Sequence, residues 1–144
     1  MKLFTNRPTA GFTLMETLTA IVIMGILAAI AMPHFTRLLP GIRLSSAARQ
    51  IATDLQLARM RAISQHANQT VAFNIATATY TFTPGSDTRN LSQLYPGTTI
   101  VSKSAGDPTF TTTGTSVAAT TITISNNSVT KQVQVNTIGR VSIP

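Results

Sequence analysis

One stretch near the amino terminus constrains what this chain can fold into. Between Thr17 and Thr36 there is no Asp, Glu, Lys or Arg, and most side chains are aliphatic. A helix needs about 20 apolar residues to cross the hydrocarbon core of a bilayer, and this run has that length. Lys2 and Arg7 precede it, which favours an amino terminus that stays in the cytoplasm. We therefore expect a membrane-spanning helix over residues 12–40.

Glu16 is an unexpected residue at the start of such a helix. A charge at the centre of a membrane helix costs about 2.5–3.5 kcal/mol on insertion scales. A secretory signal peptide with residues 29–31 (Ala-Ile-Ala) as its small-residue cleavage site gains nothing from an acid, and neither does a plain signal anchor. Both of these simple interpretations leave the carboxylate without a role.

The sequence around Glu16 resembles the processing site of type IV pilins and type II secretion pseudopilins. The string GFTLME at residues 11–16 follows a short basic leader and precedes the apolar run. The resemblance implies that prepilin peptidase removes the leader, residues 1–11, by cutting between Gly11 and Phe12, and that Phe12 is then N-methylated. It also implies that Glu16 pairs with the Phe12 amine of a neighbouring subunit, because a cation in an apolar environment is tolerated mainly when paired.

Two prolines are expected to interrupt the helix. Pro33 removes a backbone hydrogen bond and should kink the helix, and Pro40-Gly41 is a turn signal and a predicted boundary. Residues 42–66 then predict an amphipathic helix. Its apolar residues recur at spacings of three and four: Leu44, Ala47, Ala48, Ile51, Leu55, Ala58 and Ala62.

The remainder of the chain predicts β-structure, because apolar residues alternate with polar ones from about residue 70. The predicted strands cover residues 70–74, the segment around Tyr80 and Phe82, and residues 99–102, 121–125, 131–135 and 138–144. Asn126-Asn127 is the expected hairpin turn, and residues 86–98 and 103–109 are expected to be loops. The predicted fold is therefore α+β: a long helix, apolar and then amphipathic, packed on a small antiparallel sheet in a globular domain over residues 41–144.

The globular part is similar to the GspH/FimT branch of minor pilins and minor pseudopilins. Residues 58–62 (Ala-Arg-Met-Arg-Ala) and Gly139-Arg140 after the last hairpin carry this similarity. FimT-like members are associated with DNA capture for natural transformation, with a Gly-Arg-x-Arg pattern in which Ser142 here replaces the second Arg. The resemblance implies a minor pilin in or at the tip of a pilus. A GspH-like pseudopilin of a type II secretion system is the alternative, and a major pilin stays open.

The charge balance allows an anionic partner. The chain has 11 Lys and Arg against 4 Asp and Glu, a net charge of +7. The candidate contacts to double-stranded DNA are Arg140, Lys131, Lys103 and Arg89, which would bind phosphate without reading sequence. Lys131 and Arg140 would share one face if the last strands are neighbours. Cations on a strand edge also discourage aggregation between sheets, and this second interpretation stays open.

Catalysis is not indicated. The chain has no Cys and only two His, and it lacks the HExxH, P-loop and GxSxG motifs. We expect no enzyme activity, no cofactor and no metal site. The expected partners are other pilin subunits, prepilin peptidase, the inner membrane and DNA. The expected location is the inner membrane, with a single span, followed by a pilus in the periplasm or at the cell surface.

Overall fold

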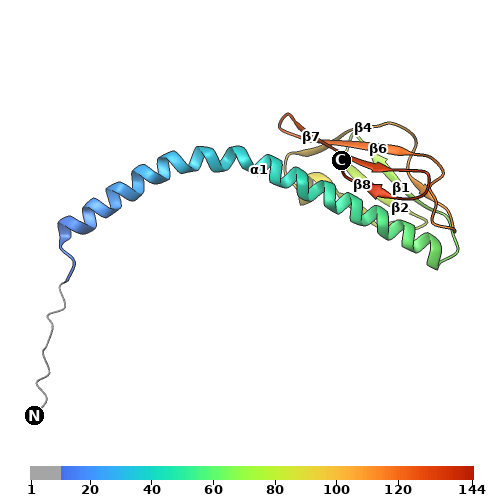
Figure 1. Ribbon diagram of the computed structural model, residues 1–144, viewed down its shortest axis with the longest axis horizontal. Helices are drawn as coiled ribbons and strands as arrows, with labels where there is room; N and C mark the ends of the chain where they lie inside the picture. Colours follow the sequence, from blue (N-terminus) through green and yellow to red (C-terminus); the bar gives the residue numbers. More distant parts are fainter. Residues whose placement is uncertain (1–10) are drawn as a thin grey trace, which may run out of the picture. The chain divides into compact units, whose positions relative to one another are not determined.

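A computed structural model describes residues 11–144 of the chain (Figure 1). Apart from Gly11, the predicted leader lies outside the described residues. The first element, α1 (Leu14–Ser64), is a helix of 51 residues. The chain divides into two compact units, one ending at Arg37 and the other covering residues 38–144, and each is described by itself.

The first unit is dominated by the apolar part of α1. Every described side chain up to Leu38 is exposed, and this part of the helix is long and apolar enough to cross a membrane. Its few hydroxyl groups bond to backbone carbonyls of the same helix: Thr17 to Thr13 and Thr19 to Met15. Internal bonding of this kind satisfies polar groups where water is absent. The helix therefore fits a membrane anchor.

The predicted break at Pro40-Gly41 is wrong, because α1 continues through it and also through Pro33. A proline removes one donor and crowds one preceding turn, while the flanking hydrogen bonds can carry the helix onward. The turn at Gly41 gains a further bond, since the Ser45 hydroxyl donates to the Gly41 carbonyl over 2.9 Å. The Pro-Gly turn signal did not end the helix, because helical residues on both sides continue it.

The second part of α1 buries the predicted apolar stripe against the strands of its own unit (Figure 1). All seven predicted positions are buried: Leu44, Ala47, Ala48, Ile51, Leu55, Ala58 and Ala62. An eighth buried residue on this face is Asp54, which the periodicity did not single out. The predicted amphipathic helix is confirmed.

The strands form two antiparallel four-stranded sheets, where one small sheet was expected. The first sheet has the order β3 (Thr88–Asn90), β2 (Thr79–Thr83), β1 (Gln69–Asn74) and β5 (Thr109–Phe110). The second has the order β4 (Thr98–Lys103), β6 (Thr120–Asn126), β7 (Val129–Val135) and β8 (Val141–Ser142). Buried side chains of both sheets and of α1 form one core. The predicted α+β architecture is confirmed, with two sheets in place of one.

Some local predictions differ from the structure. The predicted loop over residues 86–98 contains β3 and a short helix, α2 (Leu91–Leu94), which the Asn90 side chain caps. The hairpin between β6 and β7 turns at Asn127-Ser128, one residue later than predicted, with φ of 47° and 72°. Positive φ at both central residues is the geometry that two-residue hairpins favour. The last strand is also shorter than the predicted segment over residues 138–144.

Candidate functional site

The predicted cleavage point lies just before α1. Gly11 and Phe12 have no helical structure, and the Phe12 side chain is 84% exposed. A peptidase has to reach an unfolded stretch of backbone, so a junction outside the helix suits cleavage. Thr13 then begins the helix, because its hydroxyl accepts a hydrogen bond from the Glu16 backbone over 3.2 Å.

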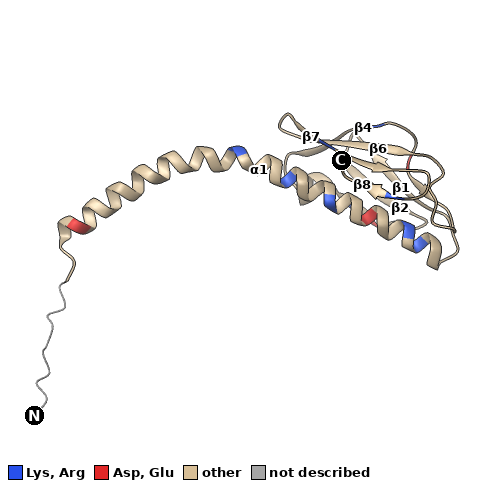
Figure 2. Ribbon diagram, in the orientation of Figure 1, with Lys and Arg blue, Asp and Glu red and all other residues tan. Residues whose placement is uncertain are grey.

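Glu16 also lies in a helix-capping sequence pattern that the sequence analysis missed. Residues 13–16 read Thr-Leu-Met-Glu, which is the pattern of a helix capping box, with Thr at the cap and Glu three positions later. An acid in the first helical turn is also stabilised by the helix dipole. Glu16 is the single acidic residue from Gly11 to Arg37, and Figure 2 shows red near the start of α1. Among residues 11–144 it has no ionic partner.

Two of the four predicted DNA contacts lie beside acids. Lys103 Nζ lies 2.6 Å from Asp107 Oδ1 and also donates to the Phe73 carbonyl. Asp107 in turn accepts from the Phe73 backbone N–H, so this pair links β4 of one sheet to β1 of the other. Arg89 lies 3.6 Å from Asp87. Both cations are therefore partly committed to contacts within the fold.

Lys131 and Arg140 are not brought together on one face. The register pairs β7 Gln134 with β8 Ser142, and the Asn136 backbone N–H donates to the Arg140 carbonyl. Arg140 thus lies opposite the end of β7, whereas Lys131 lies near its beginning. At about 3.3 Å per residue the two positions are roughly 16 Å apart along the strand. The predicted pairing of Lys131 and Arg140 on one face is therefore not found.

Arg140 instead borders a polar groove of about 480 Å³ on the second sheet, together with Thr121, Gln134, Asn136 and Ser142. Arg140 is exposed, and among the described residues no acid pairs with it. Its backbone N–H is held by the Asn136 side chain over 2.7 Å. The groove offers one guanidinium among neutral hydrogen-bonding groups, a chemistry that suits a single phosphate contact.

Both sequence segments that resemble the GspH/FimT branch meet at the Gly114 carbonyl. Arg59 Nε donates to this oxygen over 2.8 Å. Gly139, with φ of 79°, lies so close that an added Cβ would overlap the same carbonyl. Arg59 and Gly139 thus fasten the end of α1 to two loops. Sequence reasoning missed Gly114, for which the only signal was a lone glycine in a Thr-rich stretch.

A buried carboxylate links α1 to the first sheet. The Tyr80 hydroxyl donates to Asp54 Oδ2 over 2.5 Å, and Gln50 Nε2 donates to the same oxygen over 3.1 Å. Burial, and then the hydrogen bond and the charge of Asp54, raise the pKa of Tyr80 above its usual value. The sequence signal was an acid on the apolar stripe, between Ile51 and Ala58.

The described residues offer no arrangement for metal chemistry. No group of three or more His, Asp or Glu within residues 11–144 is placed to hold a metal ion. The features that remain are an exposed apolar helix with an acid in its first turn, and two of the four predicted DNA contacts, Lys131 and Arg140, which have no ionic partner among residues 11–144.

A long amino-terminal helix, apolar and then amphipathic, packed on antiparallel sheets defines a pilin-like protein. Residues 47–139 match the family described as Type II transport protein GspH, so the chain belongs to this family of structural pilins and pseudopilins. Residues 6–32 match the prokaryotic N-terminal methylation motif. The predicted resemblance to type IV pilins and pseudopilins is confirmed.

Solved structures show the same fold. The type IV minor pilin FimU of Pseudomonas aeruginosa is 21% identical, with a TM-score of 0.57 over 70% of this chain and 87% of that one. The minor pseudopilin EpsH from the type 2 secretion system of Vibrio cholerae is 14% identical, with a TM-score of 0.57 over 71% of this chain and 96% of that one. No curated protein matches in sequence.

Proposed function

We propose that this chain is a minor subunit of a type IV pilus or of the related pseudopilus, anchored in the inner membrane by α1 until it is assembled. One observation carries the proposal. The side chains of α1 from Leu14 to Leu38 are exposed and almost all uncharged, whereas the rest of α1 packs one face against its own chain. The exposed part needs an apolar partner, which lipid supplies first and the helices of other subunits supply in the filament.

Processing precedes assembly in this proposal. Prepilin peptidase removes residues 1–11 by cutting between Gly11 and Phe12, and Phe12 is methylated. Residues 12–40 then act as the membrane and assembly segment, and residues 41–144 as the globular domain. Glu16 pairs with the Phe12 amine of the adjacent subunit, and the pair fixes the register of one helix against the next.

The Glu16 variants test this assembly step. Glu16→Gln keeps a residue suited to the capping box but removes the charge, whereas Glu16→Ala removes both. We expect both variants to be cleaved normally and both to be lost from sheared filaments, measured by immunoblotting. Normal incorporation of Glu16→Gln with loss of Glu16→Ala would show that Glu16 only caps the helix. Normal incorporation of both would contradict any role for this acid in assembly.

The type of filament is a separate part of the proposal. FimU is a type IV minor pilin and EpsH is a minor pseudopilin of a type 2 secretion system, and both share the fold with equal TM-scores. We favour the pilus, with the secretion pseudopilus as the alternative. Deletion should reduce surface piliation while leaving protein export intact. Loss of export with normal piliation would assign the chain to the secretion system.

DNA capture is a second candidate function, supported by the exposed guanidinium of Arg140 in its polar groove. One phosphate contact gives weak, salt-sensitive binding without sequence preference. We would titrate detergent-solubilised protein with double-stranded DNA at low and physiological salt, with Arg140→Ala and Lys103→Ala as a matched pair. Weakening by Arg140→Ala alone supports this role. Absence of binding at low salt, or equal effects of the two variants, would contradict it.

A further inference from the structure

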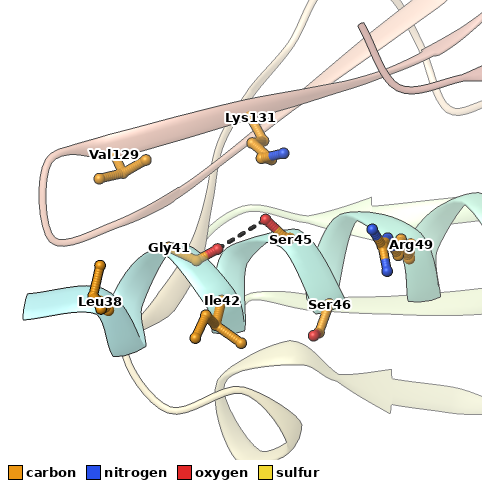
Figure 3. Close-up of a pocket in the computed structure, with 8 residues that line it drawn as sticks. All are labelled: Leu38, Gly41, Ile42, Ser45, Ser46, Arg49, Val129 and Lys131. Atoms are coloured by element: carbon orange, nitrogen blue, oxygen red, sulfur yellow. Dashed lines mark hydrogen bonds between the residues drawn. The ribbon is translucent and has the colours of Figure 1, made fainter. Parts of the chain in front are cut away.

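A groove in the second unit opens between α1 and the hairpin formed by β6 and β7. Its volume is about 550 Å³, and all of its lining residues belong to the second unit. Figure 3 shows Lys131 and Val129 of β7 on one side of the groove and the turn of α1 that carries Gly41 on the other. Leu38 and Arg49 of α1 also line it. We call this feature the hairpin groove.

The hairpin groove forms where the packing of α1 against the second sheet ends. Alternate residues of β7 face the core, and Val133 is buried there. Lys131, two residues earlier, lies on the same side of the strand, because it pairs with the buried Ile124 of β6. The turns of α1 at this level carry Gly41 and Ser45, whose side chains are too small to fill the space. The core-facing side of the hairpin is therefore left open at this end.

The hairpin groove holds positive charge that this chain does not neutralise. Arg49 and Lys131 have no ionic partner among residues 11–144. Each Asp of the second unit is engaged elsewhere, Asp54 in the core and Asp87 and Asp107 beside other cations. A second copy of this unit would therefore meet the groove with like charge and without a free acidic side chain. The complementary charge has to come from a different chain.

The hairpin groove also presents apolar surface beside its cations. Leu38 is 58% exposed and Val129 is 46% exposed. The phosphates of a nucleic acid would pair with the cations but would leave these two side chains uncovered. A protein segment with a carboxylate next to aliphatic side chains matches both parts of the lining. Leu38 also belongs to the proposed assembly segment, residues 12–40, so a subunit that packs on the end of this segment lies next to the groove.

We propose that the hairpin groove docks a segment of a different subunit of the same filament. A carboxylate of that segment pairs with Lys131 and Arg49, while its aliphatic side chains pack on Leu38 and Val129. The charge makes the contact selective for an unlike neighbour, because a second copy of this chain brings like charge. The inference rests on the proposed function, which places the chain among the subunits of a filament.

Zero-length crosslinking of sheared filaments that contain the mature protein tests this pairing. A water-soluble carbodiimide joins a lysine amine to a carboxylate in contact with it, and mass spectrometry identifies the joined peptides. We expect Lys131 to be joined to an Asp or Glu of a different subunit. Lys103 and Asp107, whose charged atoms lie 2.6 Å apart, are the internal positive control. Lys131→Arg should lose the crosslink but remain in filaments, because it keeps the charge and removes the reactive amine.

Incorporation into filaments gives a second readout. Lys131→Gln and Arg49→Gln should each lower the amount of protein in sheared filaments about three- to fivefold, measured by immunoblotting against the amount left in the membrane. Gln132→Glu is the matched control for Lys131→Gln, since it changes the net charge by the same amount on the opposite, exposed face of β7. This control should leave incorporation unchanged.

Three results would overturn the proposal. A crosslink between Lys103 and Asp107 without any crosslink at Lys131 would show that no carboxylate occupies the groove. A crosslink from Lys131 to a second copy of this chain would show that the neighbour is a like subunit. Equal losses from filaments in Lys131→Gln and Gln132→Glu would show a net-charge effect without a site. Absence of the wild-type protein from filaments is a separate result, which would contradict the proposed function itself.

Discussion

The residues of α1 before Leu38 and those from Leu38 to Ser64 belong to one helix, yet their side chains have different surroundings. The earlier residues are exposed all round and mostly apolar. The later residues bury one stripe in a core shared with both sheets and expose the rest. A helix that is apolar on every side needs a partner around its whole circumference, whereas an amphipathic helix needs one along a single face. The first part therefore depends on lipid or other subunits, and the second on its own chain.

Two matched leucines give the largest expected contrast. Leu55 is fully buried in the core, and Leu27 is 60% exposed on the earlier part of the helix. Leu55→Ala should lower the free energy of unfolding of the globular unit by about 2–5 kcal/mol, because it leaves a cavity. Leu27→Ala should leave it unchanged. Pulse proteolysis of the detergent-solubilised protein in urea measures both. Similar losses in the two variants would show that the units do not unfold separately.

Two glycines test how the later part of α1 is held against the neighbouring loops. An added Cβ at Gly139 would overlap the Gly114 carbonyl, and its positive φ disfavours other residues, whereas Gly106 has open space around it. We expect Gly139→Ala to lower the free energy of unfolding by about 2–3 kcal/mol, and Gly106→Ala to change it by less than about 0.5 kcal/mol, in the same proteolysis assay. Equal effects would contradict the proposed fastening role of Gly139.

Tyr80 tests the polar contact between α1 and the first sheet. Tyr80→Phe leaves the buried Asp54 with one donor fewer and should cost about 1–3 kcal/mol of unfolding free energy. Tyr95→Phe serves as the control, because Tyr95 is only partly buried beside the core. A change of less than about 0.5 kcal/mol in Tyr80→Phe would show that the hydrogen bond adds little to stability.

The same contact predicts a dependence of stability on pH. The fold raises the pKa of Tyr80 above the value of about 10 that the unfolded chain has. The neutral Tyr80 hydroxyl therefore stabilises the fold fully below pH 10, and this stabilisation is lost as the pH rises above that value. Urea titrations between pH 9 and pH 11 should therefore show a steeper loss in the wild type than in Tyr80→Phe. Identical slopes would contradict the assignment of this titration to Tyr80.

Periodicity predicted the elements of this fold better than their arrangement. The stripe from Leu44 to Ala62 could be predicted because its apolar residues recur with the period of a helix. The division of the strands into two sheets could not be predicted, because it depends on pairs such as Thr70 with Thr109, which are distant in sequence. The short helix α2 was missed because it rests on a single cap at Asn90.

Some residues of the candidate site could likewise be predicted from the sequence, and others could not. Gly11, Phe12 and Glu16 form a contiguous motif and were visible in the sequence. The contacts of Lys103 with Asp107 and of Tyr80 with Asp54 depend on packing between elements, and so does the distance between Lys131 and Arg140. Sequence reasoning therefore grouped Lys131 with Arg140, which the structure separates, and it missed the buried carboxylate.

The amino terminus of the mature protein tests the central claim most directly. The protein would be purified from cell membranes and its amino-terminal peptide identified by mass spectrometry. The account predicts a chain that begins at Phe12 and carries one methyl group on the amine. A chain that begins at Met32, after the Ala-Ile-Ala segment, would show a secretory signal peptide. A chain that retains residues 1–11 would show a plain signal anchor. Either result would contradict assembly through Phe12 and Glu16.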